Sequence, residues 1–293
     1  MNMHFSTNIV INIIRMLAVI PLALIVDGIF RKVLARMQNR AGPPIIQPFY
    51  DIVKLFGKKK SDSRGYKNIF FRVIPILYFL STYGLFLFIL GIINFQFDFI
   101  MFIYIIVLSS GLYIILGLVS NSPFGVFGSM RDMLLMICYE IALTICVFSF
   151  IVYSDVLSLG QLNESWMILK LPLASLCMFV VVLVETRITP FDTAEAEPEI
   201  MGSVETEYSG KGLGLLDMSR QLKLLFFVIM LTKFLFNPAG ILAFILFSIL
   251  ILFILIFSEA TSARYRTDQT FNILLIVLLL SVIEFIRLYI LVW

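Results

Sequence analysis

Long runs of apolar residues, broken by short polar stretches, dominate the whole chain. A helix that crosses a lipid bilayer needs about 20 mostly apolar residues. By that measure the pattern predicts an all-α polytopic membrane protein with about eight spanning helices, which form a single integral membrane domain over residues 1–293. The predicted spans are residues 9–30, 69–93, 99–119, 133–153, 167–186, 221–236, 239–257 and 272–292.

The composition agrees with this pattern. Hydrophobic residues make up 60% of the chain and charged residues only 14%, whereas soluble chains average roughly 45–50% and about 25%. A globule of this length has no way to hide so much apolar surface from water, so lipid is expected to surround most of it. The same composition excludes a disordered chain, a collagen and a disulfide-bonded secreted scaffold.

Residues able to hold a redox centre are scarce. The cysteines Cys138, Cys146 and Cys177 include no CxxC pair, and the only histidine is His4. Such spacing does not supply the ligands of an iron–sulfur cluster or a structural zinc site, and one histidine is too few for a bis-histidine haem. We therefore expect no cofactor, metal or catalytic residue in this chain, so that any electron transfer takes place in partner proteins.

Basic residues gather in alternate loops. Loops 31–68, 120–132, 187–220 and 258–271 hold sixteen of the 22 Lys and Arg residues, ten of them in the first loop. The opposite loops, 94–98, 154–166 and 237–238, and both termini hold none. Because cytoplasmic loops carry an excess of Lys and Arg, this asymmetry predicts a multi-pass protein of the cell membrane. The four basic loops would be cytoplasmic and both termini outside.

The longest basic loop contains a predicted amphipathic helix after Pro48, since proline is tolerated in the first turn of a helix. Asp51 and Lys54 are expected to pair across i, i+3 on its polar face, and the helix to lie along the cytoplasmic interface. Its apolar face would be formed by Phe49, Ile52, Val53 and Phe56. Anchoring to anionic lipid alone also explains the basic residues, but it leaves Gly42-Pro43-Pro44 and Gln47 unexplained.

Four acidic residues, Asp27, Glu140, Glu185 and Glu284, fall inside predicted spans, where a charge is costly and therefore indicates a function. Glu140 lies eight residues into span 133–153 with no charged residue within four positions, and a buried unpaired carboxyl suits proton loading and release. Glu284 has Arg287 at i+3, so a structural pair and a functional role are equally open. For Asp27, a pair with Arg31 that snorkels to the membrane surface is favoured.

Residues 185–217 form the densest acidic segment, with eight acids against Arg187 and Lys211. Like charges this close raise one another's proton affinity and titrate together, so they can store and pass protons. Charge runs are usually solvated loops, but here apolar residues interleave and the segment starts from a membrane-embedded glutamate, which favours a proton path. The acids are Glu185, Asp192, Glu195, Glu197, Glu199, Glu205, Glu207 and Asp217.

Three segments carry a resemblance to a known family: RMQNRAGPPIIQPFYDIVKLF, MRDMLLMICYE and ETRITPFDTAEAEPEIMGSVETEYSG. Together they resemble the membrane subunit shared by respiratory complex I (the family of the NADH-quinone oxidoreductase H subunit) and the group 4 energy-converting, membrane-bound nickel–iron hydrogenases. The resemblance runs from about residue 15 to residue 235 and fits the predicted spans.

Two features separate the branches of this family. In the quinone-reducing members a longer stretch joins the Arg-x-Gly-Pro to the glutamine, whereas here residues 40–47 are compact. This is similar to the hydrogenases, the formate hydrogenlyases and the sulfur-reducing complexes. After Tyr208-Ser209-Gly210, relatives from complex I continue towards Ala-Glu-Tyr, whereas this chain has Leu215-Leu216-Asp217. Both features favour the hydrogenase-type branch.

The resemblance implies a non-catalytic subunit of an oxidoreductase complex, one that joins a hydrophilic redox arm to antiporter-like, ion-pumping membrane subunits. A hydrogenase-like large subunit and a small iron–sulfur subunit would dock on the cytoplasmic loops and hold the nickel–iron and iron–sulfur centres; no nucleic acid is implied. The proton path would be Glu140, Glu185, Asp192, Glu195, Glu197, Glu199, Glu205, Glu207 and Asp217. The docking residues would be Arg36, Arg40, Gln47, Asp51, Lys54 and Arg131.

Three interpretations remain: a hydrogenase-type coupling subunit, the quinone-site membrane subunit of complex I, and a stand-alone ion-coupled transporter. The third explains the intramembrane acids but not the docking loop. In addition, Pro75 and Pro172 lie near helix starts, not at the midplane where transporter helices are broken. H⁺ and Na⁺ stay open as the pumped ion because carboxylates serve both, as do the electron donor and the terminal acceptor.

Overall fold

Helices form all the regular structure of the described chain. The structure is a computed structural model that describes residues 2–59, 68–93, 98–155, 166–238 and 240–292, and these residues contain no strand. The elements are α1 (Asn2–Met37), α2 (Gln47–Gly57), α3 (Ile69–Ile89), α4 (Asp98–Val119), α5 (Pro123–Ser154), α6 (Met167–Lys170), α7 (Pro172–Glu185), α8 (Glu197–Ile200), the 3-10 turn η3 (Glu205–Glu207), α9 (Lys211–Leu235), α10 (Ile241–Thr261) and α11 (Thr267–Val292). The predicted all-α fold is confirmed.

Among the described residues, six helices are long and apolar enough to cross a membrane. They are α1, α3, α4, α5, α10 and α11. Predicted span 167–186 is divided at Leu171 into α6 and α7, where Pro172 starts a new helix, a position that suits its missing N–H. Predicted span 221–236 is the second half of the longer α9, which also carries Asp217, Arg220, Lys223 and Lys233.

Three of the predicted loops are shorter than expected. Helix α1 continues to Met37, α5 begins at Pro123 and α9 begins at Lys211, so much of loops 31–68, 120–132 and 187–220 is helical. Glu140 therefore lies further from the start of its helix than span 133–153 indicated, because Pro123 takes the first turn of α5. Lys60, Arg64 and Lys67, and most of loops 94–98 and 154–166, lie outside the described residues.

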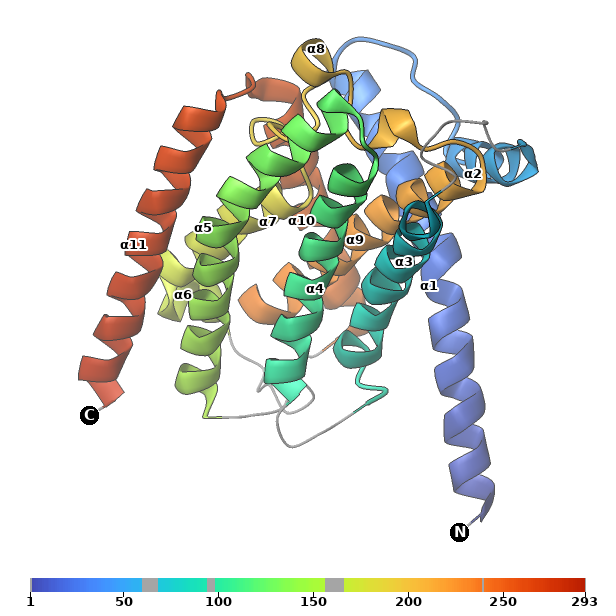
Figure 1. Cartoon of the computed structure of the whole chain (residues 1–293). Coiled ribbons are helices and arrows are strands. Elements are labelled where there is room, and N and C mark those ends of the chain that lie inside the picture. Colours follow the sequence, from blue (N-terminus) through green and yellow to red (C-terminus); the bar gives the residue numbers. More distant parts are fainter. Residues whose placement is uncertain (1, 60–67, 94–97, 156–165, 239, 293) are drawn as a thin grey trace.

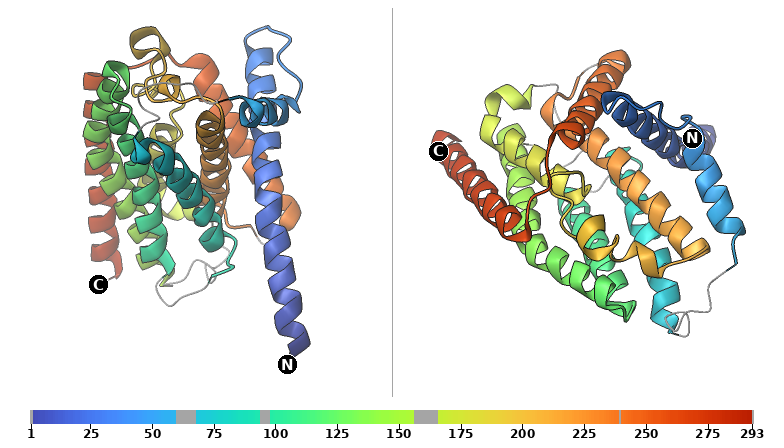
Figure 2. Two further views of the ribbon diagram at one scale, coloured as in Figure 1. Left: turned by 45° about the vertical axis from the view of Figure 1, so that its right-hand side comes forward. Right: turned by 90° about the horizontal axis from the view of Figure 1, so that it is seen from above.

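The helices stand side by side, and both termini emerge at the same end of the molecule (Figure 1). Helices α2 and α8 lie at the opposite end. Seen from above, α1 and α11 occupy opposite edges and α9 crosses the middle (Figure 2). Because α9 packs against α1, α3, α7 and α10, most of its residues are buried although the helix carries several charged side chains.

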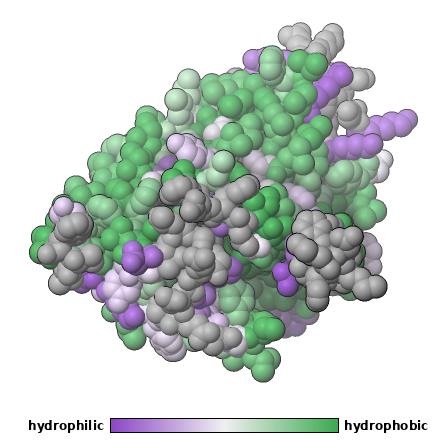
Figure 3. Space-filling model, turned by 90° about the horizontal axis from the view of Figure 1, so that it is seen from below, coloured by the Kyte–Doolittle hydropathy of each residue, from purple (hydrophilic) through white to green (hydrophobic). Residues whose placement is uncertain are grey.

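Apolar side chains cover much of the outside. On α10, Leu246 and Ile249 are well exposed, as is Ile276 on α11. Figure 3, which looks at the end that carries the termini, shows that hydrophobic residues predominate around the flanks. Monomeric soluble proteins rarely expose contiguous apolar patches of this kind, so the surface is that of a multi-pass membrane protein.

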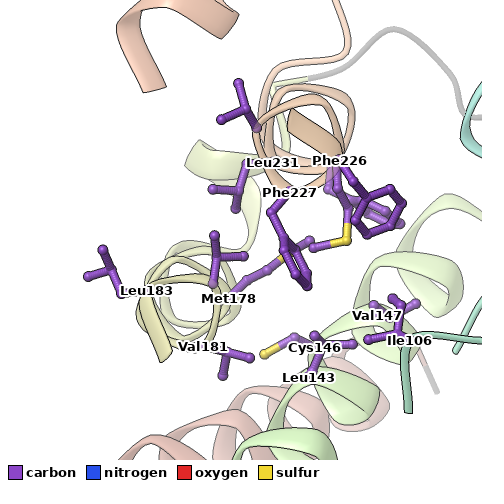
Figure 4. Close-up of a cluster of buried hydrophobic side chains, with 14 of the residues drawn as sticks. Ile106, Leu143, Cys146, Val147, Met178, Val181, Leu183, Phe226, Phe227 and Leu231 are labelled. Carbon is purple, nitrogen blue, oxygen red and sulfur yellow. The ribbon is translucent and has the colours of Figure 1, made fainter. Parts of the chain in front are cut away.

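The interior is an apolar core shared by α4, α5, α7 and α9. Ile106, Leu143, Cys146, Val147, Met178, Val181, Phe226, Phe227 and Leu231 gather there (Figure 4). Three of these helices also carry a charged residue about one helical turn from a core residue. Glu140 precedes Leu143, Glu185 follows Val181 and Lys223 precedes Phe226. Packing of the core thereby brings three charged groups from different helices together.

Candidate functional site

Ser110, Glu140, Glu185 and Lys223 form a buried group that we call the inner cluster. They come from α4, α5, α7 and α9 respectively. The Lys223 ammonium lies 2.5 Å from a Glu185 carboxylate oxygen, and the side chains of both residues are almost fully buried. Ser110 donates a hydrogen bond to the Glu185 carboxylate at 3.1 Å. Breaking such a pair from one side would leave an uncompensated buried charge, so the two groups depend on each other.

Glu140 has a different environment within the inner cluster. Both of its carboxyl oxygens are buried and accept no hydrogen bond from the described residues. The carboxyl is nevertheless close enough to Glu185, Ser110 and Lys223 to interact with them. These neighbours all come from other helices, and Glu185 carries the same charge as Glu140 when both are ionised.

Arg187, Asp132, Glu195 and Tyr113 form the middle cluster. The Arg187 guanidinium lies 2.8 Å from Asp132 and 3.3 Å from Glu195, and its central carbon is 3.3 Å from the centre of the Tyr113 ring. The Tyr113 hydroxyl donates to Glu195 at 2.6 Å. Burial works to lower the pKa of Arg187, but the surrounding acidic groups outweigh it and raise this pKa well above its ordinary value. The guanidinium therefore stays charged at every accessible pH.

Arg31, Asp27, Asp51 and Asp217 form one half of a third group, which we call the outer cluster, and Arg31 is at its centre. Its guanidinium lies 2.8 Å from Asp27, 3.2 Å from Asp51 and 3.9 Å from Asp217. The predicted pair of Asp27 and Arg31 is confirmed, but Asp27 is buried against α9 and does not reach the surface. The predicted pair of Asp51 and Lys54 is wrong, because Arg31 and Gln47 take the Asp51 carboxylate.

Arg220 and Gln221 of α9 complete the outer cluster. Arg220 lies 3.2 Å from Asp217 and 3.3 Å from Glu205 of η3. The Gln221 amide donates to Asp27 and to Asp217, each at 3.3 Å. Burial raises the pKa of Glu205, and Arg220 partly opposes this shift. The outer cluster thus joins α1, α2, η3 and α9 through charged groups.

A cavity of about 200 Å³ lies between the middle and outer clusters. Its polar lining comes from both of them and from α10, and includes Asp27, Arg31, Arg187, Glu195, Arg220 and Glu259. A polar cavity of this size has room for several water molecules, so water can join the two clusters by hydrogen bonds.

The remaining acids of the predicted path lie elsewhere. Asp192 pairs with Arg264 at 2.8 Å, and Glu199, which is exposed, pairs with Arg131 at 2.7 Å. Glu207 is half-buried and belongs to none of the three clusters. Glu197 begins α8, but its side chain lies outside the described residues. The structure therefore brings Glu140, Glu185, Glu195, Glu205 and Asp217 into the clusters and places Asp192 and Glu199 in separate ion pairs.

The predicted docking residues divide into two groups. Arg36, Arg40 and Lys54 are exposed. Asp51 and Arg131 pair with Arg31 and Glu199 of other segments, and Gln47 donates to Asp51 within α2. The predicted helix after Pro48 is confirmed as α2, but its apolar face is split. Pro48 and Ile52 are buried, while Val53 is 71% and Phe56 37% exposed, because α2 contacts the rest of the chain through a narrow strip.

Glu284 and Arg287 form the predicted i, i+3 pair at 2.6 Å, with Glu284 fully buried. Arg287 also donates to the Lys170 carbonyl oxygen, so the pair ties α11 to α6. This arrangement favours a structural pair, with the second carboxyl oxygen of Glu284 buried and accepting no hydrogen bond from the described residues.

Sequence reasoning missed several members of the clusters and one acid of the cavity, Glu259. They are Ser110, Tyr113, Asp132, Gln221, Lys223 and Glu259. Two of them carried a usable signal. Lys223 is a lysine inside a predicted span, and such a residue is by default a functional candidate. Asp132 directly follows Arg131 in the segment MRDMLLMICYE.

Comparison with known proteins gave consistent matches. The sequence profile of the family described as NADH dehydrogenase matches residues 9–290. The H subunit of NADH-quinone oxidoreductase from Rickettsia typhi is 30% identical over 270 residues, covering 82% of this chain and 79% of the relative. NADH-ubiquinone oxidoreductase chain 1 of Artemia franciscana is 31% identical over 258 residues, with coverages of 83% and 85%.

A solved structure shares the fold. One chain of the membrane-bound sulfane sulfur reductase, an archaeal respiratory membrane complex, superposes with a TM-score of 0.87. The match covers 96% of this chain and 99% of that chain at 22% sequence identity.

Proposed function

The chain belongs to the NADH dehydrogenase family, and on this premise we propose that it is the membrane subunit that couples a hydrophilic redox arm to an ion-pumping arm in a hydrogenase-type respiratory complex. It would contain no redox centre of its own. Its part would be to pass protons, and the conformational changes that accompany them, through buried carboxylates. Antiporter-like membrane subunits would receive them.

One observation carries the proposal: the three clusters form a connected series of polar groups from the α1–α2 region to the buried inner cluster. The cavity joins the outer and middle clusters. Tyr139, which is almost fully buried, lies within electrostatic reach of both the middle cluster (Asp132, Arg187) and the inner cluster (Glu140, Glu185). Ionisable groups buried in a membrane protein mark ion pathways by default.

The outer end of this series lies beside the proposed docking surface, which consists of the exposed residues Arg36, Arg40 and Lys54. We place this surface in the cytoplasm, with both termini outside, because the basic loops converge there. A hydrogenase-like large subunit and a small iron–sulfur subunit would dock on it. A redox event in that arm would then act first on Arg31 and the acids around it.

Residues 40–47 and the cavity support the hydrogenase-type branch of the family. At about 200 Å³, the cavity between the middle and outer clusters is smaller than the roughly 300–1,000 Å³ of most sites for organic ligands, which argues against a quinone bound in this cavity. The named relatives are quinone oxidoreductases, so a quinone site is the second candidate. Inhibition of electron flux by a quinone analogue in the purified complex would select it.

The deciding experiment is Glu140→Gln in the intact complex, reconstituted in proteoliposomes with electron flux and ion uptake measured together. Gln keeps the shape and removes the titratable proton. We expect the complex to assemble on a native gel but ion uptake to fall steeply, and turnover to fall with it where coupling is tight. Glu284→Gln, at the structural pair, is the matched control and should leave the ratio of ions to electrons unchanged. A wild-type ratio in Glu140→Gln would refute the proton path.

A further inference from the structure

Lys223 is a buried cation that the proposed path does not yet use. Its ammonium contacts a Glu185 oxygen at 2.5 Å and the Ser110 hydroxyl at 3.4 Å. Glu185 also accepts a hydrogen bond from Ser110, so two donors hold its carboxylate. Glu140 accepts no hydrogen bond from the described residues, although both of its oxygens are buried.

The inner cluster contains two carboxyl groups and one ammonium. Lys223 and Glu185 compensate each other, so ionisation of Glu140 would leave the three groups with a net negative charge, because Lys223 is the cation that both carboxyl groups share. A buried uncompensated charge of that kind is strongly disfavoured even after the surroundings relax. A neutral carboxylic acid avoids this cost, which assigns the proton to Glu140 in the arrangement seen here.

We propose that Lys223 is a positioning residue that makes Glu140 and Glu185 share a single proton, held by Glu140 at rest. The inference rests on the proposed function, because it describes one step of that path. When the Lys223 ammonium moves from Glu185 to Glu140, Glu140 gives up its proton and Glu185 takes it. Lys223 stays protonated throughout, so the net charge of the three groups is zero before and after the step.

The chemistry of Lys223 and Ser110 suits this exchange. Lysine carries three donors on a flexible stem of four carbons, unlike the rigid fork of arginine. A serine hydroxyl both donates and accepts, and the Ser110 hydroxyl is within reach of Lys223 and of Glu185. The hydroxyl can therefore follow the ammonium and keep whichever carboxyl is ionised supplied with a donor.

Other charged and titratable groups that face the inner cluster leave this balance intact. Tyr78 of α3 and Arg187 lie within electrostatic reach of Lys223, and Tyr139 of α5 lies near both carboxyls. Tyrosines carry no charge near neutral pH. The charge of Arg187 is taken up by Asp132 and Glu195.

Labelling with dicyclohexylcarbodiimide tests where the proton is, because this reagent reacts with protonated carboxyl groups in apolar surroundings. Mass spectrometry of the intact wild-type complex at neutral pH should find Glu140 labelled and Glu185 protected. In Glu185→Gln the ammonium is left to Glu140, which then ionises, so Glu140 labelling should fall about tenfold or more. Absence of Glu140 labelling in the wild type, or equal labelling in both proteins, would overturn the proposal.

Substitution of Lys223 provides the reciprocal test. Lys223→Gln should expose Glu185 to labelling, and Lys223→Arg, which keeps the charge, should leave Glu185 protected. Lys233→Gln is the control, since Lys233 lies on the same helix but contacts the Ile89 carbonyl. Protection of Glu185 in Lys223→Gln would overturn the proposal, and Glu185→Gln decides alone where Lys223→Gln does not assemble on a native gel.

The labelling needs no turnover, so it separates this inference from the proposed function. If the labelling of Glu185 depends on Lys223 but Glu140→Gln transports ions like the wild type, the shared proton is supported and the proton path is refuted. If Glu140→Gln impairs ion transport but the labelling of Glu185 does not depend on Lys223, the proton path is supported and the shared proton is refuted.

Discussion

Arg187 is the side chain on which the middle cluster depends. Its guanidinium meets carboxylates of α5 and of the segment after α7, and it covers the Tyr113 ring of α4. The backbone of Arg187 is left-handed, with φ of 53°, a conformation that costs an ordinary residue about 1–3 kcal/mol and persists only where its surroundings enforce it. The ion pairs of Arg187 provide that enforcement.

Replacement of Arg187 by methionine should therefore destabilise the protein strongly. It leaves Asp132 and Glu195 buried without a counter-charge, which is expected to lower the free energy of unfolding by ~3–5 kcal/mol. Arg187→Lys keeps the charge but not the fork that reaches both carboxylates, so its loss should be intermediate. Thermal unfolding in detergent measures the effect. Arg266→Met, at an exposed position, is the control, and equal unfolding temperatures in both methionine variants would contradict the prediction.

Individual acids of the site could be predicted, whereas their partners could not. Glu140 and Glu185 stand out because an acidic residue in an apolar run is rare, and the energetic cost of burying it is evident from the neighbouring sequence alone. The pairing of Glu185 with Lys223, or of Arg187 with Asp132, depends on which faces of α5, α7 and α9 meet. That choice is made by the packing of side chains far apart in sequence, so a single sequence does not reveal it. The i, i+4 pair of Asp27 and Arg31 was predictable because it lies on one helix.

At the scale of elements, helix α2 is held against the start of α9 by close backbone contact. A Cβ atom on Gly210 would lie 3.0 Å from the Lys58 carbonyl oxygen, and the φ of Gly210 is +56°. A Cβ on Gly214 would lie 3.3 Å from Leu55. The existence of α2 was predictable from Pro48 and the local periodicity, but its seat on α9 was not, because glycine in Tyr-Ser-Gly signals close approach without naming the partner.

The position of α2 makes a prediction about assembly. Arg40 is exposed where the α1–α2 connection meets the proposed docking surface, and Lys59 is exposed just beyond α2. Arg40→Glu should release the hydrophilic subunits from the membrane, whereas Lys59→Glu should retain them, because a plain basic run serves only lipid contact. Quantification of hydrophilic subunits in washed membranes measures this. Equal retention in both variants would leave lipid anchoring as the role of the loop.

A second prediction at this scale concerns the contact between α5 and the acidic segment 185–217. A Cβ on Gly128 would meet the Ser203 side chain and would lie 2.8 Å from the Ala194 carbonyl oxygen, which is backbone and cannot move freely. Gly128→Ala should lower the free energy of unfolding by about 1–3 kcal/mol, the usual cost of overpacking. Gly84→Ala in α3 has open space around it and should not destabilise. A neutral Gly128→Ala, compared by thermal unfolding, would mean that this contact is loose.

At the scale of the whole molecule, class and fold were predictable because they follow from sums over many residues. Apolar content and run lengths give a helical membrane protein however the helices pack. The structure of predicted spans 167–186 and 221–236 was not predictable in this way. Helix α9 keeps its charges inside the molecule by pairing them with other helices, and Pro172 splits the segment before α7. The distribution of basic residues among the loops also predicts an orientation of the molecule in the membrane.

Both termini emerge at one end of the molecule, and α2 and α8 lie at the other (Figure 1). The positive-inside rule predicts that the end with α2 is cytoplasmic, because the basic residues concentrate in the loops at that end and none lies in the opposite predicted loops or at the termini. The three native cysteines are buried, so an introduced cysteine can be labelled against a low background. In intact cells an impermeant thiol reagent should label Asp155→Cys, which is exposed at the end of α5, and should not reach Lys59→Cys until the membrane is opened. Labelling of Lys59→Cys from outside, with Asp155→Cys protected, would show the opposite orientation. The proposed docking surface would then face away from the cytoplasm, where a cytoplasmic redox arm could not reach it.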